Sequence, residues 1–167
     1  MIVIEGMDNS GKSTLGVYLA NALNRLVQES EGPPLSDEEI NERVDRYYDL
    51  QSTVFVRHPV ISNAIYGATR PEGNPITPGR TALFYEQRPI LIYCDAGTRG
   101  LGASHVVKAH DTEQHLADIE NHYKKHLHLY RTWAAEHAHL IYRIGDDMDA
   151  LVDTAIFLEA RIHGEAN

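Results

Sequence analysis

The segment from Gly6 to Ser13 constrains the fold of this chain more than any other part of its 167 residues. It satisfies the pattern G-x-x-x-x-G-K-[S/T] without a gap. The apolar run 2–5 before it predicts a buried strand, and the leucine spacing over 14–27 after it predicts a helix. A glycine-rich turn between a strand and a helix is the context in which this pattern forms a phosphate-binding loop. A chance match in an ordinary turn is the alternative.

The conserved spacing of such a loop follows from the chemistry of phosphate binding. Gly6 and Gly11 allow successive backbone N–H groups to point into one concavity, and the following helix adds the positive end of its dipole. Lys12 supplies charge for the β- and γ-phosphates, and the Ser13 hydroxyl can bind Mg²⁺. The sequence therefore predicts ATP and Mg²⁺ as cofactors. The residues expected to bind them are Gly6, Asp8, Asn9, Ser10, Gly11, Lys12, Ser13 and Thr14.

Strands and helices are expected to alternate along the chain. Further strands are predicted over 52–56, 90–94 and 140–144, and further helices over 36–50, 81–87, 112–136 and from 148 onward. Apolar strands between helices indicate an α/β fold, so with the phosphate loop we expect a single P-loop NTPase domain over 1–167. That this domain is of the nucleotide-kinase type is implied by the resemblance described below. Its parallel sheet should have about four or five strands flanked by helices. No strand is evident between the first helix and residue 52, so an edge strand is expected to be missing.

Composition excludes several classes of partner. Fifteen Lys and Arg against 24 Asp and Glu give a net charge of -9, which repels nucleic-acid phosphates and anionic lipids, so no stable nucleic-acid binding is expected. No apolar run reaches the roughly 18 residues of a membrane span. The chain is therefore expected in the cytoplasm. The resemblance described below implies the host cytoplasm, if a phage encodes the chain, and a small nucleotide as its substrate. A homodimer is left open.

Two segments resemble the thymidylate kinases, and in particular their compact phage-encoded relatives. The first is 4–14, which contains the phosphate loop, and the second is 57–67, with an Arg-His pair followed by a Ser and a Tyr. The resemblance implies transfer of the γ-phosphoryl of ATP to a (deoxy)nucleoside monophosphate such as dTMP. It also implies that Asp8 lies near the acceptor nucleotide and that Arg57 holds its phosphate or the charge that develops during transfer.

The same resemblance places an acceptor region over 57–88. Tyr66, and Phe84 or Tyr85, would stack on the acceptor base; ordinary core packing is the alternative for Tyr66 and Phe84. Arg70, Arg80 and Arg88 flank the proline- and glycine-rich stretch there, and at least one of them is expected to contact substrate.

A glycine-rich stretch, 96–110, lies where thymidylate kinases have their lid. Arg99 within it is expected to reach the γ-phosphate as a catalytic arginine. Farther along, the spacing of His122 and His126 on one helix allows a metal site, but a solvated helix edge is the preferred interpretation.

One position departs from the pattern of these kinases. They carry an acid immediately before the arginine of the second segment, whereas this chain has Val56. An acid at a strand end commonly orients Mg²⁺ in phosphate-loop enzymes. Asp95, after the strand 90–94, is the expected replacement; otherwise Ser13, Asp8 and water would hold the metal.

Two alternatives to a nucleoside monophosphate kinase remain open. One is a kinase of a free nucleoside or modified base, which would need fewer arginines around its acceptor. The other is a nucleotide-binding regulatory protein with impaired catalysis, suggested by Val56. A guanine-nucleotide switch is disfavoured because the chain has no Asn-Lys-x-Asp element.

Overall fold

The computed structural model describes residues 1–32, 34–97 and 113–164, and the side chains within those ranges except for 113–120. Strands and helices alternate along most of this length, as predicted. In chain order the elements are β1 (Ile2–Gly6), α1 (Lys12–Ala22), β2 (Leu26–Glu29), α2 (Asp37–Tyr47), β3 (Thr53–Val56), α3 (Pro59–Gly67), α4 (Pro78–Glu86), β4 (Ile90–Cys94), α5 (Glu113–His137), β5 (Leu140–Tyr142) and α6 (Met148–Gly164).

The strands form one five-stranded sheet in the order β2-β3-β1-β4-β5. Every pairing is parallel; Ile4 of β1, for example, lies opposite Val56 of β3 on one side and Ile92 of β4 on the other. The predicted α/β fold with a parallel sheet is therefore confirmed. Because β1 is central, the loop that follows Gly6 starts in the middle of the edge where the strands end, here called the carboxyl edge.

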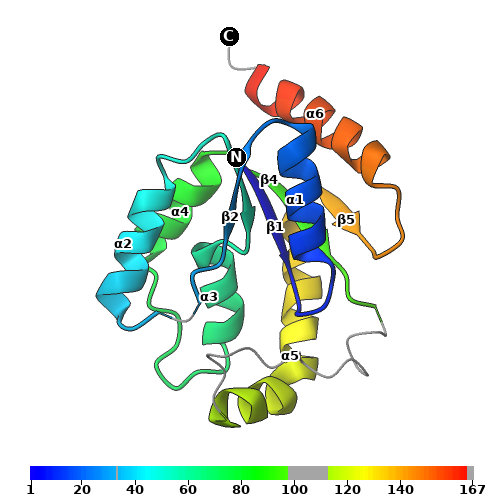
Figure 1. The fold of residues 1–167 in the computed structure, drawn as a ribbon. Coiled ribbons are helices and arrows are strands. Elements are labelled where there is room, and N and C mark those ends of the chain that lie inside the picture. The colour runs from blue at the N-terminus through cyan, green and yellow to red at the C-terminus, as the bar shows by residue number, and fades with distance from the viewer. Residues whose placement is uncertain (33, 98–112, 165–167) are drawn as a thin grey trace.

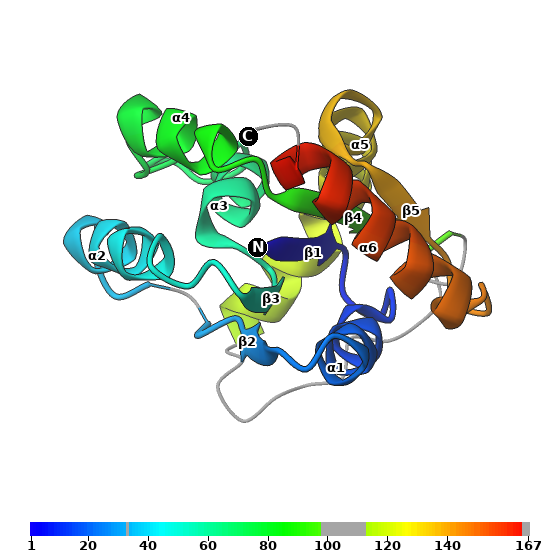
Figure 2. The same ribbon diagram turned by 90° about the horizontal axis from the view of Figure 1, so that it is seen from above.

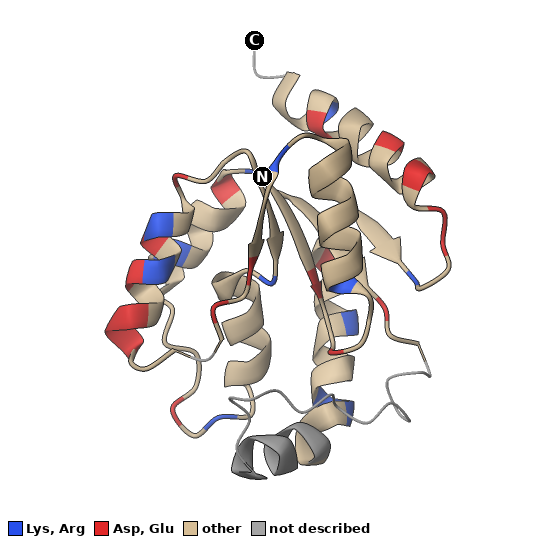
Figure 3. Cartoon of the chain, in the orientation of Figure 1, with Lys and Arg blue, Asp and Glu red and all other residues tan. Residues whose placement is uncertain are grey.

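Helices cover both faces of the sheet (Figures 1 and 2): α1 and α6 lie on one face, and α2, α3, α4 and α5 lie on the other. Side-chain alternation along β1 explains this arrangement. Ile2 and Ile4 join the core beneath α1 and α6, whereas Val3 joins the core formed with the other four helices. The net negative charge is carried partly by helix surfaces, including the acidic first turn of α2, where it complements the helix dipole (Figure 3).

The structure corrects the prediction for 14–27 and for the missing edge strand. Helix α1 ends at Ala22, and Asn24 adopts φ 51°, a left-handed conformation that turns the chain out of the helix. After Arg25, residues Leu26–Glu29 form β2, which is an edge strand of the sheet. Leu26 fits the leucine spacing that predicted the longer helix, but its side chain is 74% exposed and is not part of a buried helix face.

Smaller corrections concern helix and strand ends. Helix α4 starts at Pro78 instead of residue 81, because the Thr77 side chain caps it and Pro78 suits its first turn. Strand β5 stops at Tyr142. Helix α2 starts as expected, capped by Ser36, whose hydroxyl accepts the Glu39 N–H at 3.1 Å, but it ends at Tyr47 instead of residue 50.

Two further expectations concern metals and membranes. His126 is buried and bonded to Thr69 Oγ1 at 2.7 Å, which corrects the solvated helix edge expected there. In the part of the chain that the structure describes, no group of three or more His, Cys, Asp or Glu side chains is placed to hold a metal ion. No helix in that part is long and apolar enough to cross a membrane.

Gly16 sets how closely α1 approaches the sheet, which gives a first prediction. A Cβ there would lie 2.4 Å from Val56 Cγ2, so Gly16→Ala should lower the free energy of unfolding by about 1–3 kcal/mol through overpacking. Chemical denaturation would measure the change. Gly79→Ala on α4 is the matched control, because its Cβ would meet open space. Gly16→Ala should cost less in a Val56→Ala background than in the parent, because the clashing methyl group is then absent. An equal cost in both backgrounds would contradict this packing argument.

Candidate active site at the carboxyl edge

The phosphate loop, residues 6–13, turns sharply between β1 and α1. Positive φ angles at Gly6 (146°), Asn9 (59°) and Gly11 (86°) produce the turn. At Gly6 a side chain is excluded by space as well, since a Cβ would lie 2.3 Å from the Cys94 carbonyl oxygen of β4. Only glycine therefore allows the loop to begin this close to the sheet.

The first turn of α1 faces this loop. Gly11 caps the helix without a side-chain hydrogen bond, so no side chain occupies the amides that an anion would use. Lys12 is buried, and its Nζ donates to the Met7 carbonyl oxygen and approaches Ser10 Oγ at 3.4 Å. Burial, together with the charge of Arg57, lowers the pKa of Lys12 to about 7. Helix amides and an ammonium group are the donor set that a phosphate chain requires, so these residues fit a bound triphosphate.

Arg57 follows β3 and reaches the phosphate loop. Its backbone has φ 69°, unusual for a non-glycine residue, and its own N–H donates to the Ile4 carbonyl oxygen at 2.9 Å. The guanidinium donates to Asp8 Oδ1 at 2.7 Å and lies 5.4 Å from the centre of the Tyr66 ring. The structure thus brings together Asp8, Arg57 and Tyr66, three residues that the sequence assigned to the acceptor.

Glu5, near the end of β1, binds the residues that follow Arg57. The sequence analysis did not identify Glu5 as a site residue. Its fully buried carboxylate accepts the His58 N–H at 2.7 Å, the Ser62 hydroxyl at 3.1 Å and the Tyr130 hydroxyl at 3.1 Å. Burial raises the pKa of Glu5, while the charge of Arg57 opposes this. A charged residue within an otherwise apolar strand was the available signal, because a buried carboxylate needs such donors.

Aromatic residues of α4 are not brought to the site. Phe84 has no exposed surface and stacks on His58 at 4.5 Å between ring centres, so the core-packing alternative holds for it. Tyr85 accepts a hydrogen bond from Trp133 Nε1 at 3.2 Å and lines a cleft of about 480 Å³ with Pro89, at the opposite edge of the sheet. The reason is the direction of α4, which carries the chain back to the start of β4.

The predicted arginines are likewise dispersed. Arg88 lines the same remote cleft, away from the phosphate loop. Arg80 is held by Asp45 of α2 in a two-pronged ion pair of 2.7 and 2.8 Å. Arg70, at the end of the α3 region, donates to Asn63 Oδ1 at 3.0 Å and is exposed. That at least one of these three contacts substrate stays a prediction; Arg99 and most of the expected lid lie outside the described residues.

Asp95, the expected magnesium organiser, is already paired. One carboxylate oxygen accepts the Gly97 N–H and an Arg131 N–H, both at 3.1 Å, and the other lies 3.6 Å from Arg143 Nε. Burial alone would raise the pKa of Asp95, but the Gly97 amide and the two arginines hold it below its usual value.

A different acid faces Ser13. The Ser13 hydroxyl lies 3.4 Å from Glu29 Oε2, at the end of β2. Sequence reasoning missed Glu29 because the predicted helix, 14–27, took in the first half of this strand and no strand was expected here. An acid after the short apolar run 26–27 was the available signal. A serine hydroxyl and a carboxylate are the hard oxygen ligands that suit Mg²⁺.

No family model matches the chain, and no curated protein matches it. Among solved structures, the YorR protein of Bacillus subtilis, determined in complex with phosphorylated GDP, is similar at 22% identity, with 97% of each chain covered and a TM-score of 0.70. Structures of kinases match the fold of this chain as well, over more than nine-tenths of their length. The chain has the P-loop kinase fold.

Two of those kinase structures differ in substrate. Thymidylate kinase from Candida albicans is 13% identical, with 98% of this chain and 91% of that chain covered and a TM-score of 0.53. Shikimate kinase from Acinetobacter baumannii, in complex with shikimate, is 17% identical, with 97% and 93% covered and a TM-score of 0.52. Because nucleotide and metabolite kinases match equally well, the comparisons support the fold without selecting an acceptor.

His58, beneath the site, predicts how stability depends on pH. Its ring is fully buried, and burial lowers its pKa from 6.5 to about 3. The unfolded chain therefore binds the proton first as the pH falls. His58 costs no stability above about pH 6.5 and lowers stability progressively from there to about pH 3, by up to about 1.4 kcal/mol per pH unit.

The corresponding variant is His58→Asn, which retains an acceptor for the Val60 N–H that the ring now caps. Urea denaturation between pH 6.5 and 4 should show a shallower loss of stability with falling pH than in the parent. His128→Asn, at an exposed position of α5, should keep the parental slope. The same slope in all three proteins would argue against a neutral buried His58.

Proposed function

We propose that this chain is a phosphotransferase that moves the γ-phosphoryl group of ATP to a nucleoside monophosphate, giving the diphosphate. The observation that carries this proposal is the adjacency of the phosphate loop and the Asp8–Arg57 pair, 2.7 Å across, at one edge of the sheet. A triphosphate held by Lys12 and the α1 amides would place its terminal group beside the guanidinium of Arg57. Phosphoryl transfer is mainly a matter of such positioning and charge stabilisation.

The proposed roles follow from the contacts. Lys12 neutralises charge on the donor phosphates and moves from Met7 toward them when they bind. Arg57 exchanges Asp8 for the acceptor phosphate, which its planar guanidinium can bind through two hydrogen bonds. Tyr66 keeps the guanidinium in place through its ring face. Bound Mg²⁺ would draw charge from the β- and γ-phosphate oxygens, with the Ser13 hydroxyl among its ligands. Arg99 is proposed as a further catalytic arginine.

A deoxynucleotide such as dTMP is the first acceptor to test, on the strength of the resemblance to thymidylate kinases. One observation favours a second candidate, a kinase of a neutral nucleoside. The guanidinium of Arg57 is already paired with Asp8, which leaves less charge to attract an acceptor phosphate. An acceptor screen separates the two.

The screen measures ATP consumption with Mg²⁺ and a deoxynucleotide, a ribonucleotide, a nucleoside or no acceptor. Turnover confined to monophosphates is the expected result, and Lys12→Ala should abolish it while the circular dichroism spectrum stays unchanged. Turnover with nucleosides alone would select the second candidate. Tight ATP binding without any turnover would identify a regulatory nucleotide-binding protein instead.

Arg57→Lys provides a prediction about the acceptor. Lysine keeps the charge but loses the two-pronged hydrogen bond and the ring contact, so KM for the monophosphate should rise about 10-fold or more. Steady-state kinetics at saturating ATP would measure this. Arg80→Lys is the matched control, since its partner is Asp45 of α2; a similar rise in both variants would refute the role assigned to Arg57.

The lowered pKa of Lys12 predicts that the protein takes up a proton when ATP binds. With its pKa at about 7, the free protein carries a largely neutral Lys12 at pH 8. Triphosphate charge favours the ammonium form and raises this pKa, so binding at pH 8 should take up close to one proton. Calorimetry in buffers of different ionisation enthalpy measures the uptake, which should vanish at pH 5.5. An uptake of zero at both pH values would contradict the perturbed lysine.

A further inference from the structure

The carboxyl edge beside Ser13 lacks a carboxylate on β3. Val56, the last residue of that strand, is 3% exposed and packs toward α1, where a Cβ on Gly16 would lie 2.4 Å from its Cγ2. Asp95, after β4, is engaged by a backbone amide and two arginines. A serine hydroxyl alone is a poor site for Mg²⁺, which prefers at least one carboxylate.

Glu29 supplies a carboxylate at the end of β2, beside the position that Val56 occupies at the end of β3. It lies opposite Val56 in the β2–β3 register, one strand farther out. Paired residues of neighbouring parallel strands project from the same face, so Glu29 and Val56 both face α1. This is why Glu29 Oε2 reaches within 3.4 Å of the Ser13 hydroxyl at the start of that helix.

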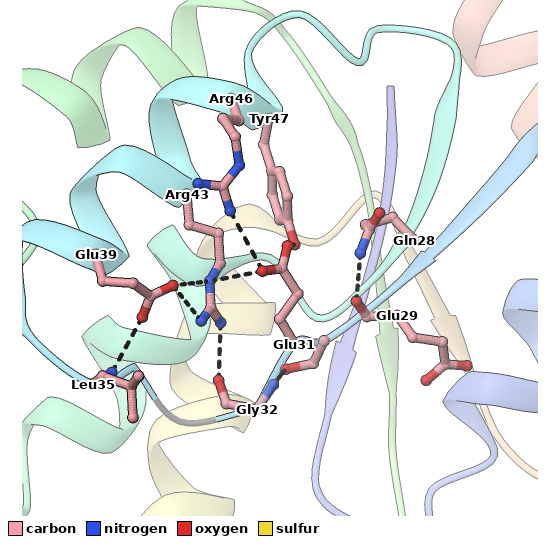
Figure 4. A network of polar contacts seen from close by, with 10 residues as sticks. Gln28, Glu29, Glu31, Gly32, Leu35, Glu39, Arg43, Arg46 and Tyr47 are labelled. Carbon is pink, nitrogen blue, oxygen red and sulfur yellow. Dashed lines mark hydrogen bonds and ion pairs between the residues drawn. The ribbon is translucent and has the colours of Figure 1, made fainter.

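The loop after Glu29 is fixed by a polar network with α2 (Figure 4). Glu31 accepts the Tyr47 hydroxyl at 2.6 Å, and Arg43 donates to the Gly32 carbonyl oxygen at 2.9 Å. Arg43 is itself 5% exposed and is held by Glu39 at 2.6 Å. The Glu29 side chain points away from this network in Figure 4, so its carboxylate is left to Ser13 while its backbone is anchored.

We propose that Glu29 is the carboxylate that, together with the Ser13 hydroxyl, orients the Mg²⁺ of the bound nucleotide. This inference rests on the proposed binding of ATP at the phosphate loop. It replaces Asp95 as the metal-orienting acid and assigns a role to the edge strand β2. A preformed Ser13–Glu29 contact means that the two oxygen ligands are close together before the metal arrives.

The test measures the Kd of ATP with and without Mg²⁺ by calorimetry, and needs no turnover. In the parent protein Mg²⁺ should tighten ATP binding. Glu29→Gln should reduce that gain in ATP affinity about 10-fold, while ATP binding without metal stays equal or becomes tighter because a negative charge has been removed.

The gain in Glu29→Asp should lie between those of the parent and Glu29→Gln. Glu42→Gln, an exposed carboxylate of α2, is the matched control and should keep the parental gain. Mn²⁺ titrations followed by electron paramagnetic resonance report the metal directly.

The outcomes are distinguishable. If the parent does not bind ATP with or without metal, the proposed function fails, and the inference fails with it. If ATP binds and Glu29→Gln keeps the full Mg²⁺ gain, only the inference fails. Loss of the gain in Asp95→Asn but not in Glu29→Gln would return the role to Asp95. In a third outcome, Glu29→Gln keeps the full Mg²⁺-dependent gain in ATP affinity, but its kcat falls and no longer decreases at acid pH. That result would identify Glu29 as a proton acceptor and would also overturn the proposal.

Discussion

The buried carboxylate of Glu5 is the interaction on which the rest of the candidate site depends. It receives a backbone N–H from His58, a hydroxyl from Ser62 of α3 and a hydroxyl from Tyr130 of α5. A buried charge without such donors would be strongly unfavourable, so these elements must meet around β1. Their meeting holds the chain at Arg57 in its left-handed conformation and aims the guanidinium at Asp8.

The carboxyl edge combines a rigid centre with adjustable charges. The phosphate loop is fixed by the close approach of Gly6 to β4, whereas Lys12 and Arg57 each rest on a partner, Met7 and Asp8, that a phosphate group can replace. Such internal pairing keeps buried cations satisfied before a nucleotide binds. Under the proposed function, a bound nucleotide would exchange one set of partners for another without rebuilding the fold, which would suit a reaction that depends on positioning.

The outer strand contributes to the site through its register. Val56 closes the gap between β3 and α1, and Glu29, beside it on β2, brings a carboxylate to Ser13. The network of Arg43 with Glu39 and Gly32 anchors the loop that follows. A polar network at the periphery of the sheet thereby helps to place an acid at its edge.

By itself, the sequence determined the phosphate loop, the α/β alternation and the parallel sheet, because each depends on local spacing within one element. The sequence also pointed to Arg57 and Tyr66 as neighbours, because both lie in one short segment. Only the tertiary structure decided that the Glu29 carboxylate meets Ser13, that Glu5 meets Tyr130, and that Asp95 is paired with arginines. It also decided that Phe84 is buried in the core and that Arg88 lines a remote cleft. Periodicity shows which face of an element is buried, but strand register, strand order and helix direction determine which distant residues meet.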